Sequence, residues 1–377
     1  MSRPLLPLAI AMFALHAQAA HVYVSSPGDG NVTQYRLDER TGALTHVQAF
    51  PAANGVAAMS LSPDGEYLYA AAPAEKGNRV LRLAIEATSG QLRASGEAPL
   101  ADRMSYISTS HSGRFLYGAS YGGGLVSAQP VPTDQAAGYP NVYRTGPNTH
   151  SIRASDDDRH VYAAVLGADR IAQFELDSET GNLAPIGEGF VSTPTGIGPR
   201  HLIIAPGGKY LYVVGELTGT VVGYAIDATT GALSEITRAE GIPPRMNLQR
   251  GVIRGSEPIP EDLAPKLIWA ADIRVTPDGR LLYISERTTS SVSAFRLDPA
   301  SGQLTFIDNF PLQEKQPRNI AIAPSGHWLI ASGEKSPVIG SYRIHESGVI
   351  ERVGEAPAGK SALWIEMLRA PAEHSAN

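Results

Sequence analysis

One turn motif recurs six times along this chain, and its spacing limits the fold more than any other feature. Each copy has a small residue and a short turn segment such as Pro-Asp-Gly, often with a glycine, followed by a pair that is aliphatic-aromatic in all copies but the last, which ends in Leu-Ile. The copies end at Tyr69, Tyr117, Tyr162, Tyr212, Tyr283 and Ile330. Successive copies are 48, 45, 50, 71 and 47 residues apart, so only the fourth step is anomalous. A period of this length is typical of stacked supersecondary units.

A second motif, Thr/Ser-Gly-x-Leu, divides the repeats further. It occurs at 41–44, 89–92, 180–183, 230–233 and 301–304, and it follows alternating segments such as Val-Ser-Ala-Phe-Arg-Leu. A Pro-Asp-Gly turn reverses the chain, and the aliphatic-aromatic run after it is typical of a buried strand. Each repeat therefore predicts four short strands: one before the first turn, one after it, and a hairpin across the second motif. Four strands in such a repeat form the blade of a β-propeller.

The length of the chain predicts seven such blades. Apart from the anomalous step, the sequence after residue 20 holds about seven repeats, of which six have a visible turn. The two chain ends must then share the seventh blade, and the strands at 21–24 and 362–365 are the available ones. Closing the ring in this way removes free sheet edges, which otherwise promote aggregation. We expect an all-β, seven-bladed β-propeller in a single domain over 21–377, with its last blade closed by N- and C-terminal strands.

The anomalous step contains an irregular insertion at 241–266. Its prolines, at 243, 244, 258 and 260, forbid long regular elements. The insertion is either a lid over one face of the ring or a surface loop with no role.

The first twenty residues have the features of a secretory leader. Arg3 gives a short basic start, 5–15 is apolar, and Ala17-Gln18-Ala19 has the small-x-small form of a cleavage site. The apolar run is much shorter than the ~20 residues that span a membrane. We expect 1–20 to be a signal peptide and the mature chain, which has no membrane span, to be periplasmic or secreted. A leader that does not function would leave the protein in the cytoplasm.

Composition excludes several classes of function. The chain has no cysteine, so it has no disulfide framework, no cysteine zinc site and no cysteine nucleophile. The absence of thiols also fits export to an oxidising compartment. The formal net charge is −6, which provides no global basic surface for nucleic acid. We therefore expect no nucleic-acid partner.

Charged residues occur at matching positions of the later repeats. Those before the first strand of a repeat are His150, Arg200, His201, Asp272, Gln316 and Arg318. Those just after the second strand are Glu216, Glu286, Arg287, Glu334 and Lys335. The two earliest repeats carry only Met59, Ser105 and Tyr106 near the first of these positions. Because the loops of a propeller converge at one mouth of its channel, this uneven distribution predicts a single off-centre cleft.

Each of these residues also has a purely structural interpretation. In that interpretation, Arg–Glu ion pairs hold neighbouring blades together, His201 is a hydrogen-bonded spacer, and Asp272 caps a turn. His111, His160 and His327 occupy turn positions, where we expect solvated surface side chains.

The motifs together resemble a known family. Asn-Thr-His-Ser at 148–151, Gly-Pro-Arg-His at 198–201, Gly-Glu-Leu at 215–217, Trp-Ala-Ala-Asp-Ile at 269–273, Glu-Arg-Thr at 286–288 and Gln-Pro-Arg at 316–318 are similar to those of the bacterial 6-phosphogluconolactonase family. That family has a seven-bladed lactonase propeller and includes fungal carboxymuconate lactonizing enzymes. The resemblance implies hydrolysis of 6-phosphogluconolactone or a related sugar lactone. It also implies that the catalytic residues proposed for the family fall on His150, Arg200, Glu216 and Arg287.

Opening a lactone requires an activated water, a stabiliser for the oxyanion and a proton for the departing ring oxygen. We predict Glu216 or His150 as the general base and Arg200 as the oxyanion stabiliser. Arg287 and Arg318 are predicted to hold a phosphate or carboxylate, for which a bidentate guanidinium is suited. His201 and Asp272 are predicted to orient these groups, and Gln316 to contribute to substrate binding. No metal or other cofactor is required.

Three alternatives stay open. One is a calcium-dependent gluconolactonase-type propeller with Glu216 and Asp272 as candidate ligands, which the neighbouring arginines oppose. Another is a muconate cycloisomerase-type propeller that uses the same arginines. The third is an exported propeller that binds a protein and catalyses nothing. The expected partner is a small sugar lactone; the oligomeric state is open, with a monomer favoured.

Overall fold

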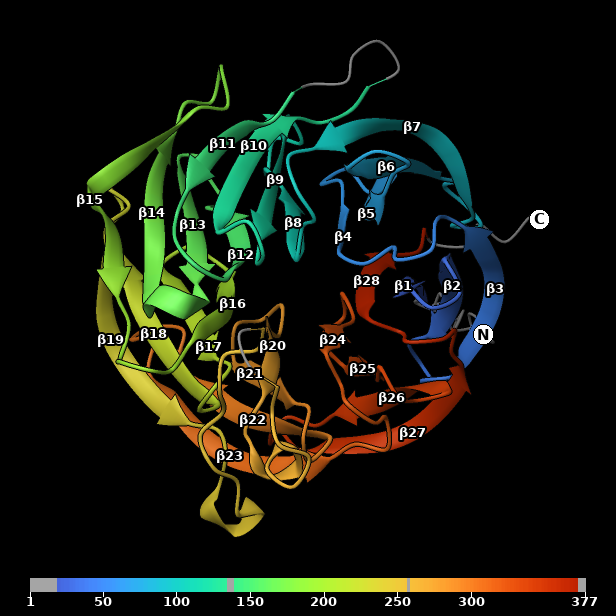
Figure 1. Cartoon of the computed structure of the whole chain (residues 1–377). Coiled ribbons are helices and arrows are strands. Elements are labelled where there is room, and N and C mark those ends of the chain that lie inside the picture. The colour runs from blue at the N-terminus through green and yellow to red at the C-terminus, as the bar shows by residue number, and fades with distance from the viewer. Residues whose placement is uncertain (1–18, 134–138, 256–257, 372–377) are drawn as a thin grey trace, which may run out of the picture.

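The computed structural model describes residues 19–133, 139–255 and 258–371. Within these residues, seven antiparallel four-stranded sheets surround a central channel (Figure 1). The described residues contain no α-helix, only three short 3-10 turns. The prediction of an all-β, seven-bladed propeller is confirmed.

Each blade runs from an inner strand at the channel to an outer strand at the rim, and the blades are numbered here in chain order. Blade 1 consists of β28 (Trp364–Arg369), β1 (Ala19–Ser26), β2 (Asn31–Asp38) and β3 (Leu44–Pro51). Blade 2 consists of β4 (Met59–Leu61), β5 (Tyr67–Pro73), β6 (Asn78–Ile85) and β7 (Leu92–Leu100). Blade 3 consists of β8 (Tyr106–Thr109), β9 (Phe115–Ser120), β10 (Leu125–Pro130) and β11 (Asn141–Arg144).

The later blades follow the same order. Blade 4 consists of β12 (Thr149–Ala154), β13 (His160–Val165), β14 (Arg170–Leu176) and β15 (Leu183–Ser192), with η1 (Leu166–Ala168) after β13. Blade 5 consists of β16 (Pro199–Ile204), β17 (Tyr210–Gly215), β18 (Thr220–Ile226) and β19 (Leu233–Glu240). Blade 6 consists of β20 (Ala270–Val275), β21 (Leu281–Glu286), β22 (Ser291–Leu297) and β23 (Leu304–Pro311). Blade 7 consists of β24 (Asn319–Ile322), β25 (Trp328–Ser332), β26 (Val338–Ile344) and β27 (Ile350–Pro357).

The Pro-Asp-Gly turns join the inner strand of a blade to the second strand, as predicted. In blade 2 the Ser62 hydroxyl and the backbone N–H of Glu66 donate to the Asp64 carboxylate at 2.5 and 2.9 Å. The following Gly65 has a φ of +73°, a left-handed conformation that favours glycine. The aspartate therefore organises the turn, and the glycine allows the chain to reverse.

The two repeated motifs also contact each other across blade boundaries. The hydroxyl of Tyr162 donates to the carbonyl of Gly231 at 2.7 Å, and that of Tyr212 donates to Gly302 at 2.8 Å. Each tyrosine lies in the second strand of one blade, and each glycine lies in the outer hairpin of the next. In these two pairs of blades, the first motif of one blade is therefore joined to the second motif of the next.

One prediction about the turns is wrong. His111 and His327 are exposed, as expected, but His160 begins β13 and is only 5 % exposed. The hairpin at Gly231 of blade 5 packs against its ring, and no β-carbon could fit there. The position of a residue within the turn motif does not show whether a neighbouring blade covers its side chain.

The two chain ends meet in blade 1, where β1 pairs with β28 (Figure 1). Val24 lies opposite Ile365 and Ala20 opposite Arg369, in an antiparallel register. The predicted closure of the ring by the terminal strands is confirmed. The predicted leader lies mostly outside the described residues, since these begin at Ala19, the first residue of β1. No helix among the described residues is long and apolar enough to cross a membrane.

The insertion at 241–266 connects β19 to β20 and contains η2 (Pro244–Met246) and η3 (Ala264–Lys266). It begins at the rim of the ring and returns to the channel mouth, where the backbone N–H of Gly251 donates to the carbonyl of Leu217 at 2.8 Å. Two blades away, in blade 3, the Tyr121 hydroxyl after β9 donates to the carbonyl of Arg254 at 2.9 Å. These contacts with blades 5 and 3 place the insertion as a partial cover of the mouth.

Candidate active site

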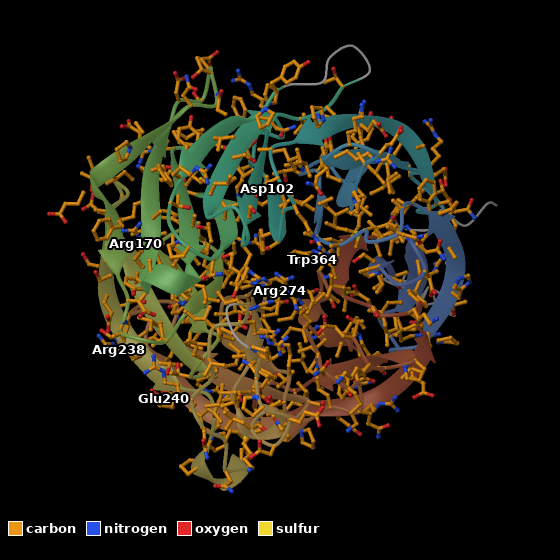
Figure 2. All side chains as sticks on the ribbon, viewed as in Figure 1. Asp102, Arg170, Arg238, Glu240, Arg274 and Trp364 are labelled. Atoms are coloured by element: carbon orange, nitrogen blue, oxygen red, sulfur yellow. The ribbon has the colours of Figure 1, made fainter. Side chains whose placement is uncertain are left out.

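A cavity of about 410 Å³ opens at this mouth of the channel. Six of the eight predicted site residues line it: His150, Arg200, His201, Glu216, Arg287 and Arg318. They come from blades 4 to 7, whereas blades 1 to 3 contribute mainly neutral residues such as Trp364 and Tyr121. Figure 2 shows the side chains of Trp364 and Arg274 near the centre of the ring. The predicted off-centre cleft is therefore found at this mouth of the channel.

Glu216 lies between two guanidinium groups. Its Oε1 accepts a hydrogen bond from Arg287 at 2.7 Å, and its Oε2 lies 3.0 Å from Nε of Arg200. All three side chains are buried. Burial raises the pKa of Glu216, but Arg287 and Arg200 outweigh that effect and lower the pKa to about 2. The carboxylate is therefore ionised at neutral pH, and both of its oxygens are occupied.

The matching positions in neighbouring blades create this cluster. Glu216 directly follows β17 and Arg287 directly follows β21, and the backbone N–H of each donates to a residue that precedes the inner strand of its own blade. Arg287 also donates through Nε to the carbonyl of Trp269 at 3.0 Å, and Arg200 donates to the carbonyl of Ala271. The blade backbone thus fixes both guanidinium groups in position.

Two buried histidines line the cavity next to each other. The rings of His150 and His201 have centroids 5.1 Å apart, and His150 also contacts the ring of Tyr121. Burial lowers the pKa of each well below 6.5, and the charge of Arg200 lowers both further. Both imidazoles are therefore neutral at pH 7. In His150 the Nδ1 atom has no hydrogen-bond partner among the described residues.

Asp272 lies behind His201 and does not itself line the cavity. Its Oδ1 is 2.8 Å from Nδ1 of His201, and its Oδ2 accepts from the Asn319 amide at 2.7 Å. Oδ2 also lies 3.3 Å from the Arg274 guanidinium. Burial raises the pKa of this carboxyl, and Arg274 opposes the shift. Asp272 is part of strand β20, so the structural alternative, in which it caps a turn, is wrong.

Gln316 is not among the residues that line the cavity. Its backbone is left-handed, with a φ of 57°, and its N–H donates to the Ser290 hydroxyl at 3.2 Å. Its carbonyl accepts from the N–H of Glu334 at 3.1 Å. Gln316 therefore forms the turn that precedes β24, and its contribution to substrate binding stays a prediction.

Arg254 is a cavity residue that the repeats did not predict. Its guanidinium carbon lies 3.8 Å from the centre of the Trp269 ring, and its buried Nε has no hydrogen-bond partner among the described residues. In the described part of the chain no carboxylate forms an ion pair with it, whereas Arg318 lies 3.5 Å from Glu334. Arg254 belongs to the insertion, where matching between repeats gives no signal.

Tyr121 was also missed, but the sequence did contain a signal for it. It follows the repeated tyrosine, Tyr117, by four residues, and Glu216 follows Tyr212 by the same number. Both residues line the cavity from the loop after a second strand. A search for aromatic as well as charged residues at this position would have identified Tyr121.

The described part of the chain offers no cluster of side chains of the kind that the calcium-dependent alternative requires. No three His, Asp or Glu side chains converge there in a way that could hold a metal ion. Of the two candidate ligands, Glu216 is bound by arginines and Asp272 by His201, Asn319 and Arg274.

Comparison with known proteins agrees with this architecture. Residues 21–367 match the family described as "Lactonase, 7-bladed beta-propeller". The 6-phosphogluconolactonase of Serratia proteamaculans is 34% identical over 92% of this chain and 98% of its own length. That of Klebsiella pneumoniae is 33% identical over 91% of this chain and 97% of its own length.

Solved structures show the same fold. The periplasmic gluconolactonase of Pseudomonas aeruginosa aligns with a TM-score of 0.79 at 24% identity, over 94% of this chain and all of that one. A putative 6-phosphogluconolactonase from Bacteroides fragilis aligns with a TM-score of 0.78 at 22% identity, over 94% of this chain and 99% of that one. The extent of the family match and the identity to full-length relatives lead to one conclusion. This chain belongs to the family of seven-bladed β-propeller lactonases.

Proposed function

We propose that this protein hydrolyses an acidic sugar lactone, with 6-phosphogluconolactone as the leading candidate, to the corresponding aldonic acid. The observation that carries the proposal is the charge of the cavity. Its lining includes the arginines Arg103, Arg200, Arg254, Arg287 and Arg318 against two carboxylates, Asp102 and Glu216, and Glu216 pairs with Arg200 and Arg287. A small cavity with this excess of guanidinium groups suits a substrate that is anionic and that becomes more anionic as it reacts.

The cluster around Glu216 serves the reacting carbonyl. Attack of water on a lactone carbonyl places a negative charge on its oxygen, and preorganised donors stabilise that charge. Arg200 and Arg287 are held rigidly by Glu216 and by backbone carbonyls, so they need little reorganisation to do this. Glu216, with a pKa of about 2 and both oxygens occupied, is a weak base. Its role in this proposal is to position the two arginines, and a neutral cavity histidine accepts the proton.

The remaining arginines serve the anionic group of the substrate. Arg254 has no carboxylate partner among the described residues, and Arg318 is paired with Glu334 at the longer distance of 3.5 Å. The name of the curated relatives, 6-phosphogluconolactonase, supports a phosphate as this group. A carboxylate, as in a muconate-type lactone, would use the same residues.

We also propose that the protein is exported. The apolar N-terminal segment with its small-x-small site supports this, as does the structural similarity to the periplasmic gluconolactonase of Pseudomonas aeruginosa. Intact-mass measurement on protein from its native cell should show the loss of about 19 or 20 residues. A full-length mass would contradict export.

The direct test of the activity is a pH-indicator assay that compares glucono-lactone with its 6-phosphate, corrected for spontaneous hydrolysis. We expect both to be hydrolysed and the phosphorylated form to have the higher kcat/KM. Equal values would remove the anion site from the proposal. No enzymatic turnover of either lactone would contradict the function and favour the non-catalytic, protein-binding alternative. Activity that survives EDTA treatment would exclude the calcium-dependent alternative.

A further inference from the structure

His201 and Asp272 form a buried histidine–carboxylate pair at the wall of the cavity. His201 lies on β16 of blade 5 and Asp272 on β20 of blade 6, and Nδ1 and Oδ1 are 2.8 Å apart. The other ring nitrogen of His201, Nε2, is buried and has no hydrogen-bond partner among the described residues. His201 lines the cavity, whereas Asp272 lies behind it.

The surroundings of Asp272 define the protonation of the pair. Its Oδ2 accepts hydrogen bonds from the Asn319 amide and the Ile320 backbone N–H, and it lies close to Arg274. Burial raises the pKa of Asp272, but these two hydrogen bonds and the charge of Arg274 oppose that shift and favour the ionised carboxylate, which can only accept. His201 then donates its proton from Nδ1, which leaves the lone pair of the ring on Nε2.

The other candidate bases lack this arrangement. Glu216 accepts a hydrogen bond from Arg287 and lies beside Arg200, and these two charges lower its pKa to about 2, which makes it a weak base. His150 has no carboxylate partner among the described residues, and nothing holds its proton on one nitrogen. Only His201 combines a neutral ring, a fixed tautomer and an unpartnered nitrogen in the cavity lining.

We propose that His201 is the general base of lactone hydrolysis and that Asp272 is the residue that positions it. This proposal rests on the lactonase activity proposed above. Nε2 removes a proton from water as the oxygen of that water bonds to the lactone carbonyl carbon. The bond between that carbon and the ring oxygen then breaks, and Nε2 returns the proton to the departing ring oxygen. The products are one hydroxy acid and an unchanged enzyme, and the acid loses its own proton to solvent.

The charges around His201 determine the pH dependence. The charged and titratable groups that face it come from five elements: Arg200 on its own strand, Tyr106 on β8, His150 and Arg153 on β12, Asp272 and Arg274 on β20, and Arg318 before β24. Burial and the arginines keep the pKa of His201 well below 6.5, so the base remains neutral in mildly acidic solution. We therefore expect kcat/KM to stay constant from neutral pH to below about pH 6.5 and to fall only in more acidic solution.

The test compares His201→Gln, His150→Gln and Asp272→Asn in the full-length protein. Removing a positioned base typically costs about 10²–10⁴-fold in rate. We expect His201→Gln to lower kcat by this factor with little change in KM, and His150→Gln to lower it less. The control is His21→Gln, which removes a buried imidazole on β1 that is not part of the cavity lining and should leave kcat unchanged. Thermal unfolding of each variant checks the fold.

A second measurement separates positioning from packing. The imidazole nitrogen NMR shifts of His201 should show the proton on Nδ1 in the wild type, and Asp272→Asn should change this distribution while His201 stays buried. If the wild type hydrolyses lactones and His201→Gln retains more than about a tenth of kcat, the proposal is overturned. The same holds if the proton lies on Nε2. If the wild type hydrolyses no lactone, the proposed function has failed instead.

Discussion

Glu216 is the residue at which burial and charge compete most directly, and the competition has a measurable consequence for stability. Its pKa falls from 4.5 to about 2 in the folded protein, because Arg287 and Arg200 outweigh burial. A lowered pKa stabilises the fold fully above about pH 4.5, and this contribution is lost as the pH falls toward 2. The shift corresponds to about 3 kcal/mol at neutral pH.

We predict that Glu216→Gln lowers the free energy of unfolding by about 3–5 kcal/mol at pH 7, because it leaves two buried guanidinium groups without their carboxylate. The difference from wild type should shrink as the pH approaches about 3, since the wild-type carboxylate is then increasingly protonated. Urea unfolding across this pH range measures both effects. Glu97→Gln, which breaks the exposed pair with Arg79, should cost under about 1 kcal/mol. A pH-independent loss at Glu216 would contradict the argument.

The sequence predicted the location of these residues better than their roles. Equivalent positions in successive repeats were sufficient to place His150, Arg200, Glu216 and Arg287 at one mouth. They were not sufficient to show that Glu216 is bound on both oxygens, or that Asp272 reaches His201 from the neighbouring blade. Those contacts depend on how one blade is rotated relative to the next, and the position of a residue within its repeat gives no information about that rotation. Gln316 differs from the others: it occupies a matching position in its repeat, but it forms a turn and is not among the residues that line the cavity.

At the scale of elements, the blades could be predicted and the insertion could not. The turn motifs indicated where neighbouring strands end and begin, because aspartates that organise turns and left-handed glycines reverse the chain at these points. The insertion has no repeat partner, so its path followed from contacts that no local pattern encodes. The bond from Tyr121 to the carbonyl of Arg254 is one of them.

The insertion leads to a prediction about substrate choice. Arg254 lines the cavity and has no carboxylate partner among the described residues. Arg254→Ala should therefore raise KM for the 6-phosphorylated lactone by about 10–100-fold, the effect of losing one charge-assisted hydrogen bond. The preference over unphosphorylated glucono-lactone should fall by the same factor. The control is Arg245→Ala, which removes an exposed arginine of the same insertion that pairs with Asp308 and lies outside the cavity lining. An unchanged preference would remove Arg254 from substrate recognition.

At the scale of the whole molecule, the order of the blades around the ring matters more than where the chain begins. Blade 1 takes its inner strand from the C-terminus and its other strands from the N-terminus, and that inner strand contributes Trp364 to the cavity. Blade 1 is also joined to blade 7, because the Trp328 indole of blade 7 donates to the carbonyl of Glu39 in blade 1 at 2.7 Å. This boundary between the last and the first blade therefore has the same kind of side-chain to backbone hydrogen bond as the boundaries between other blades.

A circular permutant tests this argument. Ala20 and Arg369 lie opposite each other in the β1–β28 pair, so a short glycine-rich linker can join the two strands as a hairpin. New ends can be placed in the exposed turn at 75–77, between β5 and β6 of blade 2. Because every strand pair and every cavity residue is retained, we expect kcat within about twofold of wild type and a Tm within about 4 °C. A permutant opened between Tyr283 and Ile284, inside the buried strand β21, should fail to fold. If the first permutant also fails, the ring depends on the native order of its ends, and the β1–β28 pairing alone does not close it.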